Sequence, residues 1–340
     1  MVTVSEDLQP LTPSEGVDMF LEHRKPSVRE SSMQNARHRL SVFLEWCEEA
    51  EIDNLNDLTG RELSLFVSWR RGDVAPITLQ KQLSSVRMAL RWWADIEAVE
   101  DGLAEKLHAP ELPDGAESRE VFLEADRAKQ ALRYFDRHHY ASRDHALLAL
   151  IWRTGMRRGA VRALDVGDLD EDEQAIRVEH RPDTETPLKN GDSGSRWVYL
   201  GPRWFQVLDD YVTNPDRKTV VDEHGRRPLF TTRQGTRPTG HSIYKWIIRA
   251  LHPCTYAECP HDRTPSDCEA RGGNSSPSRC PSARSPHAVR RGAITNHLNE
   301  ETAPETVSER MDVSLEVLYE HYDARTEREK MTVRRQDVPE

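Results

Sequence analysis

Long apolar runs are absent from this 340-residue sequence. A helix that crosses a bilayer needs roughly 20 consecutive apolar residues, and no stretch approaches that length. The first ten residues, MVTVSEDLQP, are acidic and polar and do not resemble a secretory signal. These absences argue against a membrane-spanning or secreted protein, and we expect a cytoplasmic one.

Lysine is scarce as well. Eight of the 47 basic residues are lysine and the other 39 are arginine, against 58 acidic residues and a net charge of −11. Because concentrated salt screens a high net charge, an acidic excess with few lysines is typical of a halophilic protein. A GC-rich genome would explain the arginines but not the acids. The negative charge is unfavourable for contact with nucleic-acid phosphates, which requires surface cations.

Cysteine is rare and unevenly placed. Only Cys47 lies outside a stretch of 27 residues that holds the other four, Cys254, Cys259, Cys268 and Cys280. Such clustering in a cytoplasmic protein favours metal thiolates over disulfides. We expect these four to bind a structural zinc ion, with His261 as an alternative ligand, or else to be free or disulfide-linked. The surrounding segment, 252–284, has few apolar residues and would need a metal or another tether to become ordered.

Length and periodicity predict two domains, since 340 residues suffice for two separate cores. Residues 1–13 are polar and acidic and indicate a disordered tail. Residues 14–108 predict a compact bundle of four amphipathic helices, the last with a buried stripe. Residues 109–119 are rich in proline, glycine and acids and predict a linker. The second domain then extends over residues 120–336.

The second domain combines helical patterns with two short β-like runs. Helices are predicted around residues 123–138 and 142–153, and strands at 175–178 and 196–200. The turn-forming segment between the two strands contains Lys189, the only lysine between Lys129 and Lys218.

A TG-x-R motif at residues 154–157 follows the second of these helices. Gly155 is expected to end that helix in the left-handed conformation. Arg157 then offers a planar guanidinium that matches the oxygens of a phosphate.

Two further motifs follow toward the C-terminus. Ser285 and Pro286 predict the start of a helix, so His287 and Arg290, three residues apart, share one face of it. The sequence LYEHY ends at Tyr322, whose phenol can attack phosphorus if its proton is removed and the developing oxyanion is stabilised.

This order and spacing of TG-x-R, H-x-x-R and a final tyrosine resembles the tyrosine recombinase (phage integrase) family, from about residue 12 to about residue 335. The resemblance implies a mainly helical fold. It consists of a four-helix, SAM-like core-binding domain at 14–108 that contacts DNA and a mixed, mostly helical catalytic domain at 120–336. The catalytic domain would contain a small antiparallel β-sheet and the Cys-rich insertion at 252–284.

The resemblance also implies a site-specific recombinase that works as a tetramer on two double-stranded DNA sites, with no cofactor for catalysis. The residues it assigns to catalysis are Arg157, Lys189, His287, Arg290 and Tyr322. Tyr319 is the alternative nucleophile, although it looks like a helix-packing residue, and His321 is an auxiliary donor or base.

Two positions depart from the family pattern. Ala160 stands where the family usually has an acid, which removes a supporting hydrogen bond to Arg157. The histidine or tryptophan expected nine residues before the nucleophile is replaced by Val313; Asp312 occupies the equivalent turn if one residue has been added. These departures leave open a catalytically impaired, DNA-binding regulator or accessory protein. A type IB topoisomerase and a zinc module for protein contact are further alternatives.

Overall fold

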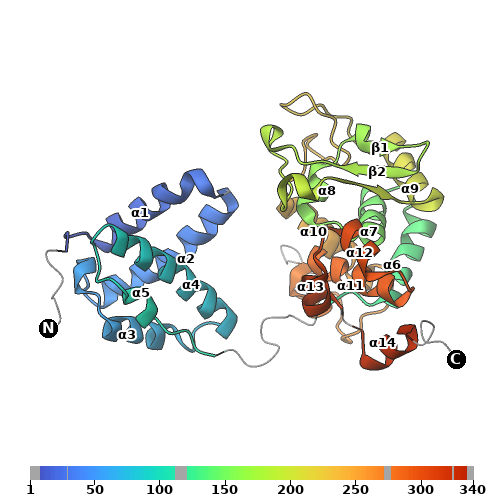
Figure 1. Ribbon diagram of the computed structural model, residues 1–340. Helices are drawn as coiled ribbons and strands as arrows, with labels where there is room; N and C mark the ends of the chain where they lie inside the picture. The colour runs from blue at the N-terminus through green and yellow to red at the C-terminus, as the bar shows by residue number, and fades with distance from the viewer. Residues whose placement is uncertain (1–7, 29, 112–120, 272–276, 324, 335–340) are drawn as a thin grey trace. The chain divides into compact units, whose positions relative to one another are not determined.

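The computed structural model describes residues 8–28, 30–111, 121–271, 277–323 and 325–334. The chain divides into two compact units, Met1–Arg119 and Glu120–Glu340 (Figure 1). Most of the predicted linker at 109–119 and the first half of the predicted tail at 1–13 lie outside the described residues. Within these ranges, no helix has the length and apolarity that crossing a membrane demands.

The first unit is a helical bundle. Its helices are α1 (Pro13–Arg24), α2 (Glu30–Glu49), α3 (Gly60–Arg70), α4 (Pro76–Asp95) and the single turn α5 (Leu103–Lys106), with the short 3-10 turns η1 (Lys25–Ser27) and η2 (Leu55–Asp57) between them. Thr12 and Thr59 cap α1 and α3 by accepting main-chain N–H groups with their side chains. The stripe predicted on the fourth helix is buried in full: Leu79, Leu83, Val86, Leu90 and Trp93.

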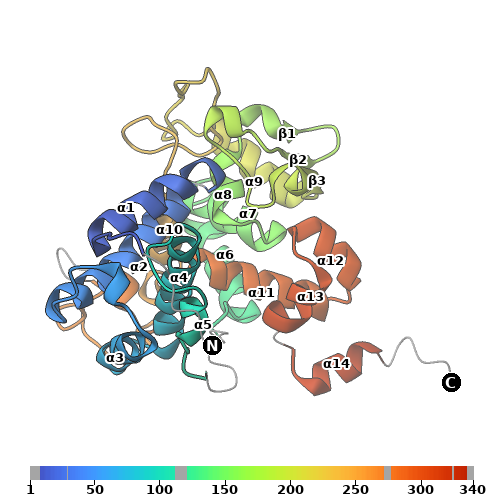
Figure 2. The same ribbon diagram turned by 60° about the vertical axis from the view of Figure 1, so that its left-hand side comes forward.

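The second unit is mostly helical. Its helices are α6 (Ala125–His138), α7 (Arg143–Thr154), α8 (Arg158–Ala163), α9 (Pro202–Thr213), α10 (Gly240–Ala250), α11 (Pro286–Asn299), α12 (Pro304–Met311), α13 (Leu315–Val317), the π-helical turn η8 (Leu318–Tyr322) and α14 (Glu327–Arg334). Helix α11 packs against α7, α10, α12 and α6. Figures 1 and 2 both show α14 set apart from these helices.

A small antiparallel sheet lies at one end of this unit (Figures 1 and 2). Its strands, β1 (Leu169–Asp170), β2 (Ala175–Val178) and β3 (Arg196–Tyr199), lie in the order β1-β2-β3. Ile176 pairs with Val198, and both side chains are buried in the core of the unit. The two longer strands match the predicted ones, whereas the two-residue strand β1 was not expected because so short a run has no recognisable alternation.

Helix α11 is held tightly at its start. The side chain of Ser285 accepts the N–H of Ala288, as the sequence predicts. The N–H of Leu123 donates to the carbonyl of Ala288 over 2.9 Å, so the chain before α6 lies directly against α11. A Cβ atom at Gly292 would collide with the main-chain oxygen of Leu123. Glycine is therefore required by this close approach.

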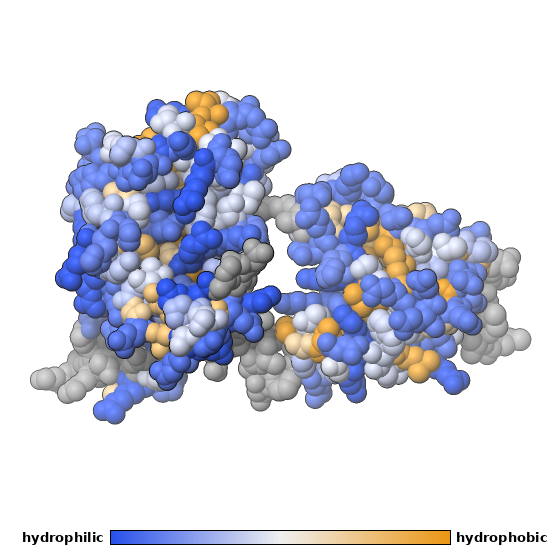
Figure 3. All heavy atoms as spheres, turned by 180° about the vertical axis from the view of Figure 1, so that it is seen from behind, coloured by the Kyte–Doolittle hydropathy of each residue, from blue (hydrophilic) through white to orange (hydrophobic). Residues whose placement is uncertain are grey.

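The mainly helical fold with a small antiparallel sheet is confirmed. On the face shown in Figure 3, hydrophilic residues cover most of both units, and apolar residues are scattered among them. The second unit places the three predicted motifs on α11, on the turn after α7 and on η8, and the contacts among these elements define the candidate site.

Candidate active site

Arg290 forms hydrogen bonds with two separate turns of the candidate site. Its side chain is 1% exposed. Nη1 donates to the carbonyl of Gly155 over 2.7 Å and to that of Met311 over 2.6 Å, and Nη2 donates to the carbonyl of Asp312 over 3.2 Å. The arginine of the H-x-x-R motif thus fixes both the TG-x-R turn and the turn that follows α12.

The charge of Arg290 is held in an unfavourable setting. Burial first, and then the positive charge of Arg157, lower the pKa of Arg290 from 12.5 to about 10, against opposing effects of Tyr322 and Asp312. The guanidinium stays charged at neutral pH. Its Cζ atom lies 5.4 Å from the centre of the Tyr322 ring. Its Nε is buried with no hydrogen-bond partner among the described residues.

Tyr322 is buried, with 7% of its surface exposed, in a cluster with Ile294, Leu298 and Leu318. Its ring centre lies 5.4 Å from that of His287. The hydroxyl of Thr295 on α11 donates to the main-chain oxygen of Tyr322 over 3.0 Å, so this residue is fixed to the histidine helix by main chain as well as side chain.

Tyr319 points away from this cluster, and the expectation that it packs against a helix is wrong, since it is 53% exposed. The turn η8 explains the difference. The N–H of Asp323 bonds to the carbonyl of Leu318, five residues back, so residues three apart do not share a face as they would in an α-helix. The side chain of His321 lies outside those that the structure describes.

Arg157 occupies the position just before α8 and is half-buried. Its Nη1 forms an ion pair with the Oδ2 atom of Asp312. Ala160 offers no carboxylate to this arginine, but Asp312, 155 residues away in the sequence, pairs with it instead. Asp312 precedes Tyr322 by ten residues, one more than the nine that the family pattern predicts. The π-helical turn η8 between them holds one residue more than an α-helical turn, which matches this difference.

Lys189 lies exposed on the loop that joins β2 to β3, as predicted. The preceding Leu188 is buried in the core of the unit. The side-chain amide of the following Asn190 donates to Oδ1 of Asp312 over 2.7 Å. The loop is therefore anchored on both sides of Lys189. Nothing in the sequence marks Asn190 as part of the site except its position beside this lysine.

His287 experiences the charges of the other catalytic candidates. Its pKa is lowered by burial first, and then by the positive charges of Arg290, Arg291, Arg157 and Lys189. These groups therefore lie close enough to act on one imidazole. The ring is neutral at pH 7 and can accept a proton. The largest influences on the pKa of His287 do not include Arg158 or Arg162, the arginines that lie near Arg157 in the sequence.

The four clustered cysteines lie near one another in two pairs. Cys268 and Cys280 are buried together. The thiol of Cys254 hydrogen-bonds to the sulfur of Cys259, and burial followed by this bond raises the pKa of Cys254. The pKa of Cys259 is lowered because its sulfur accepts the main-chain N–H groups of Arg263 and His261.

Arg127 ties this segment to the catalytic unit. Its guanidinium donates to the carbonyl of Leu251 over 2.8 Å and to the carbonyl of Ser282 over 2.7 Å, and its Nε donates to the hydroxyl of Tyr256 over 2.8 Å. The start and the end of the insertion are thus held by one side chain from α6.

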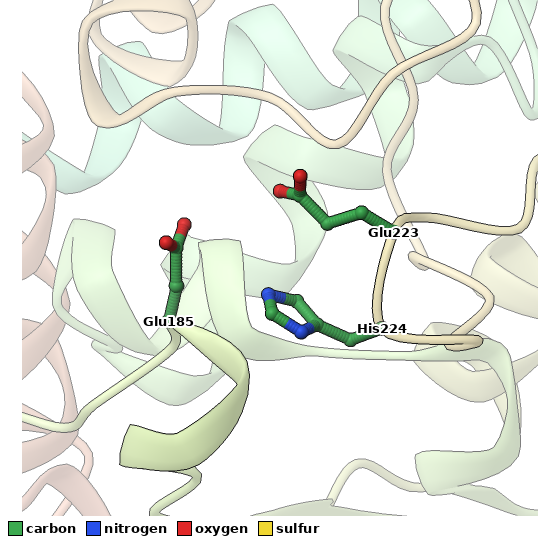
Figure 4. A group of neighbouring side chains, drawn as sticks. All are labelled: Glu185, Glu223 and His224. Carbon is green, nitrogen blue, oxygen red and sulfur yellow. The ribbon is translucent and has the colours of Figure 1, made fainter.

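A different trio has ligand atoms that all lie within 4.8 Å of one another. Figure 4 shows Glu185, Glu223 and His224, which project toward one another from two loops. They form the only such group of histidine, cysteine and acidic side chains in the described part of the chain, so the four cysteines do not reach this spacing. All three side chains are exposed, as acidic surface groups commonly are.

Comparison with curated proteins finds tyrosine recombinases. The chain is 30% identical over 243 residues to tyrosine recombinase XerC of Stutzerimonas stutzeri, an alignment that covers 68% of this chain and 79% of that protein. It is 28% identical over 215 residues to tyrosine recombinase XerC 2 of Ralstonia nicotianae, covering 58% of this chain. The alignments span 56% of the Ralstonia protein and 48% of XerC from Chlamydia trachomatis, so the chain spans about half the length of these relatives. No protein-family model matches the chain.

Solved structures agree on the fold. The Tn1549 transposon integrase, in a complex with a circular intermediate DNA, has a TM-score of 0.69 at 14% identity, covering 96% of this chain and 100% of that one. A lambda integrase dimer bound to a COC′ core site has a TM-score of 0.66 at 10% identity, covering 93% and 78%. Together with the relative that aligns over most of its length, and with the motifs assembled around Tyr322, these likenesses lead to one conclusion: the chain belongs to the tyrosine recombinase family.

Proposed function

We propose that this protein is a site-specific DNA recombinase that breaks and rejoins DNA through a 3′-phosphotyrosyl link. One observation carries the proposal: the ring of Tyr322 lies 5.4 Å both from the His287 ring and from the Arg290 guanidinium, and the charges of Arg157 and Lys189 act on the same histidine. A nucleophile, a base and three cations beside one another suit attack on a phosphodiester.

The proposed reaction begins with the phenol of Tyr322. Neutral His287 accepts the phenolic proton as the oxygen attacks phosphorus, while Arg157 and Arg290 neutralise the charge that develops on the non-bridging oxygens. The bond from phosphorus to the 5′ oxygen breaks, and Lys189 gives that oxygen a proton. The products are a 3′-phosphotyrosyl link and a free 5′-hydroxyl.

A 5′-hydroxyl from a second DNA then reverses these steps. The energy of the broken bond is kept in the phosphotyrosyl link, so the reaction proceeds without a nucleotide cofactor. The lambda integrase has been solved as a tetramer bound to a Holliday junction. By analogy we propose a tetramer of this chain on two double-stranded DNA sites, in the cytoplasm. The domain at residues 14–108 would bind the core site of the DNA, and residues 109–119 would link the two domains. The domain at residues 120–336 would carry out DNA cleavage.

The test uses suicide substrates, since the target sequence is unknown. A pool of duplexes with randomised sequence and a single nick would be incubated with the protein in concentrated salt. Cleavage near the nick releases a short strand and traps the covalent adduct, which a denaturing gel detects and sequencing identifies. We expect adducts with the wild type and none with Tyr322→Phe.

Tyr319→Phe is the matched control, because it removes an exposed phenol three residues away and should leave the adduct unchanged. Adducts lost in Tyr319→Phe but kept in Tyr322→Phe would reverse the assignment. If the wild-type protein binds the duplexes in a filter-binding assay but forms no covalent adduct, the protein is the catalytically impaired regulator instead. Relaxation of plasmid without strand exchange would identify a topoisomerase.

The Cys-rich insertion supports a second proposal, a structural zinc ion held by Cys254, Cys259, Cys268 and Cys280, with His261 as the alternative ligand. The two main-chain N–H groups that donate to the sulfur of Cys259 stabilise a thiolate, the form that binds metal. The contacts of Arg127 hold the insertion against α6, which packs against α11, so the insertion would brace α11 through α6. A small movement must bring the sulfurs closer together, since zinc–sulfur bonds are about 2.3 Å long.

Elemental analysis of protein purified with added zinc tests this proposal. We expect about one zinc per chain, and a lower melting temperature after the metal is removed with a chelator. Cys268→Ser should abolish binding, whereas Cys47→Ser, in the first unit, should retain it. Protein free of zinc that melts at the same temperature with and without added zinc would rule the ion out.

A further inference from the structure

Asp312 places a carboxylate inside a site otherwise rich in cations. It follows α12 with a left-handed backbone, at φ 55°. Its Oδ2 pairs with Nη1 of Arg157, and its Oδ1 accepts the side-chain amide of Asn190 over 2.7 Å. The main-chain oxygen of Asp312 is held separately by Arg290. The side chain can therefore turn away while the backbone stays fixed.

The charges around this carboxylate are positive. The negative charge of Asp312 acts on the guanidinium groups of Arg290 and Arg196, and Arg157 acts on both of them as well. A guanidinium and a neighbouring amide N–H are the same donors that bind a phosphate oxygen. The carboxylate of Asp312 thus occupies a position suited to an anion.

A phosphate and this carboxylate cannot share Arg157 at low cost. Two negative charges within a few ångströms repel each other strongly in a partly buried site. The ion pair itself is accessible, because 22% of the Arg157 side chain and 15% of the Asp312 side chain are exposed. An incoming phosphate can therefore reach Arg157 and compete with the carboxylate for its N–H donors.

We propose that Asp312 is an internal stand-in for the DNA phosphate, which occupies Arg157 in the DNA-free protein and must be displaced before a phosphodiester can bind there. The inference rests on the proposed function, since it takes Arg157 as a phosphate ligand. Because Asn190 holds the other carboxylate oxygen, displacement of Asp312 also releases the contact beside Lys189. Phosphate arrival and movement of the Lys189 loop are thereby linked.

Inorganic phosphate is the probe that tests the inference without any DNA. The melting temperature of the full chain would be measured against phosphate concentration, with chloride exchanged to keep ionic strength constant; the rise in melting temperature gives the dissociation constant. We expect Asp312→Asn to bind phosphate about tenfold more tightly than the wild type, since a competing negative charge has been removed. Asparagine tolerates the left-handed backbone, so the turn should be retained.

Three further variants serve as controls for the phosphate affinity of Asp312→Asn. Arg157→Gln added to Asp312→Asn should abolish the gain, which locates the phosphate at Arg157. Asp144→Asn removes a carboxylate that is paired with Arg143 at the opposite end of α7 and should change nothing. Asp312→Gly also removes the carboxylate at a left-handed position that glycine accepts, and should tighten phosphate binding as Asp312→Asn does.

Unchanged or weaker phosphate binding by Asp312→Asn would overturn the inference and make Asp312 a positioning residue for Arg157. If that variant does not fold, Asp312→Gly decides in the same direction. Phosphate binding requires no cleavage, so failure here leaves the covalent adduct with Tyr322 untouched. Conversely, if no covalent adduct forms, the measured phosphate affinities are still valid.

Discussion

The two arginines of the site differ sharply in their surroundings. Arg290 is enclosed and donates to three main-chain carbonyls, whereas Arg157 is half-buried and pairs with a single carboxylate. Removal of a buried donor leaves its partners unsatisfied, which costs far more than loss of an accessible ion pair. Arg290 therefore supports the structure as well as the proposed chemistry, while Arg157 serves mainly the chemistry.

Parallel substitutions should separate these roles. We expect Arg290→Gln to lower the free energy of unfolding by about 3 kcal/mol, since Gly155, Met311 and Asp312 lose their donor. Arg157→Gln should lower it by less than about 1 kcal/mol. Both should abolish the covalent adduct. Urea unfolding of the purified variants gives the two free energies, and equal values would contradict this distinction.

At the scale of elements, α11 carries the histidine and the buried arginine and lies at the centre of the helical packing. It contacts α7, whose C-terminal turn presents Arg157, and η8, which presents Tyr322. Its position is set partly by the main-chain contact between Leu123 and Ala288. A change that moves α11 would therefore move His287 and Arg290 together relative to Arg157 and Tyr322.

Gly292→Ala tests this dependence. The added methyl group meets the main-chain oxygen of Leu123, which cannot move as a flexible side chain could, so α11 must shift. We expect a loss of about 3 kcal/mol in the free energy of unfolding, together with loss of the adduct. Gly159→Ala, in α8, has open space around the new atom and should change stability by less than about 1 kcal/mol. Similar stability of the two variants would show that this close approach is unimportant.

At the scale of the whole molecule, four histidines are kept neutral by the fold. Burial is the main cause that lowers the pKa of His145, His252, His287 and His297. Nearby arginines lower the pKa of all four as well, and Asp136 partly opposes the effect at His145.

The halophilic character indicated by the net charge of −11 stays a prediction.

Stability should consequently fall as the pH drops below about 6.5, the ordinary histidine pKa. In that range the unfolded chain binds protons that the folded chain does not, so the free energy of unfolding decreases with decreasing pH. Melting temperatures between pH 8 and pH 5 at constant salt would measure the slope. His145→Gln combined with His297→Gln should flatten it, whereas His138→Gln, at an exposed position, should not. A melting temperature independent of pH would contradict the expectation.

Local patterns in the sequence determined much of this protein. The helix start at Ser285, the left-handed Gly155 and the stripe of α4 were all predicted, because each depends on residues within one or two helical turns. The ordered motifs ending at Tyr322 also sufficed to indicate the family.

Tertiary structure alone decided which groups meet. The pair of Arg157 with Asp312 and the bond from Arg290 to Gly155 join residues 155 and 135 positions apart, and no local pattern encodes such contacts. The exposed Tyr319 lies in a π turn that contacts α11, and no local sequence pattern predicts this turn. Sequence determines structure locally through short-range hydrogen bonds and periodicity, whereas the charges that surround a reacting phosphate are placed by packing between distant segments.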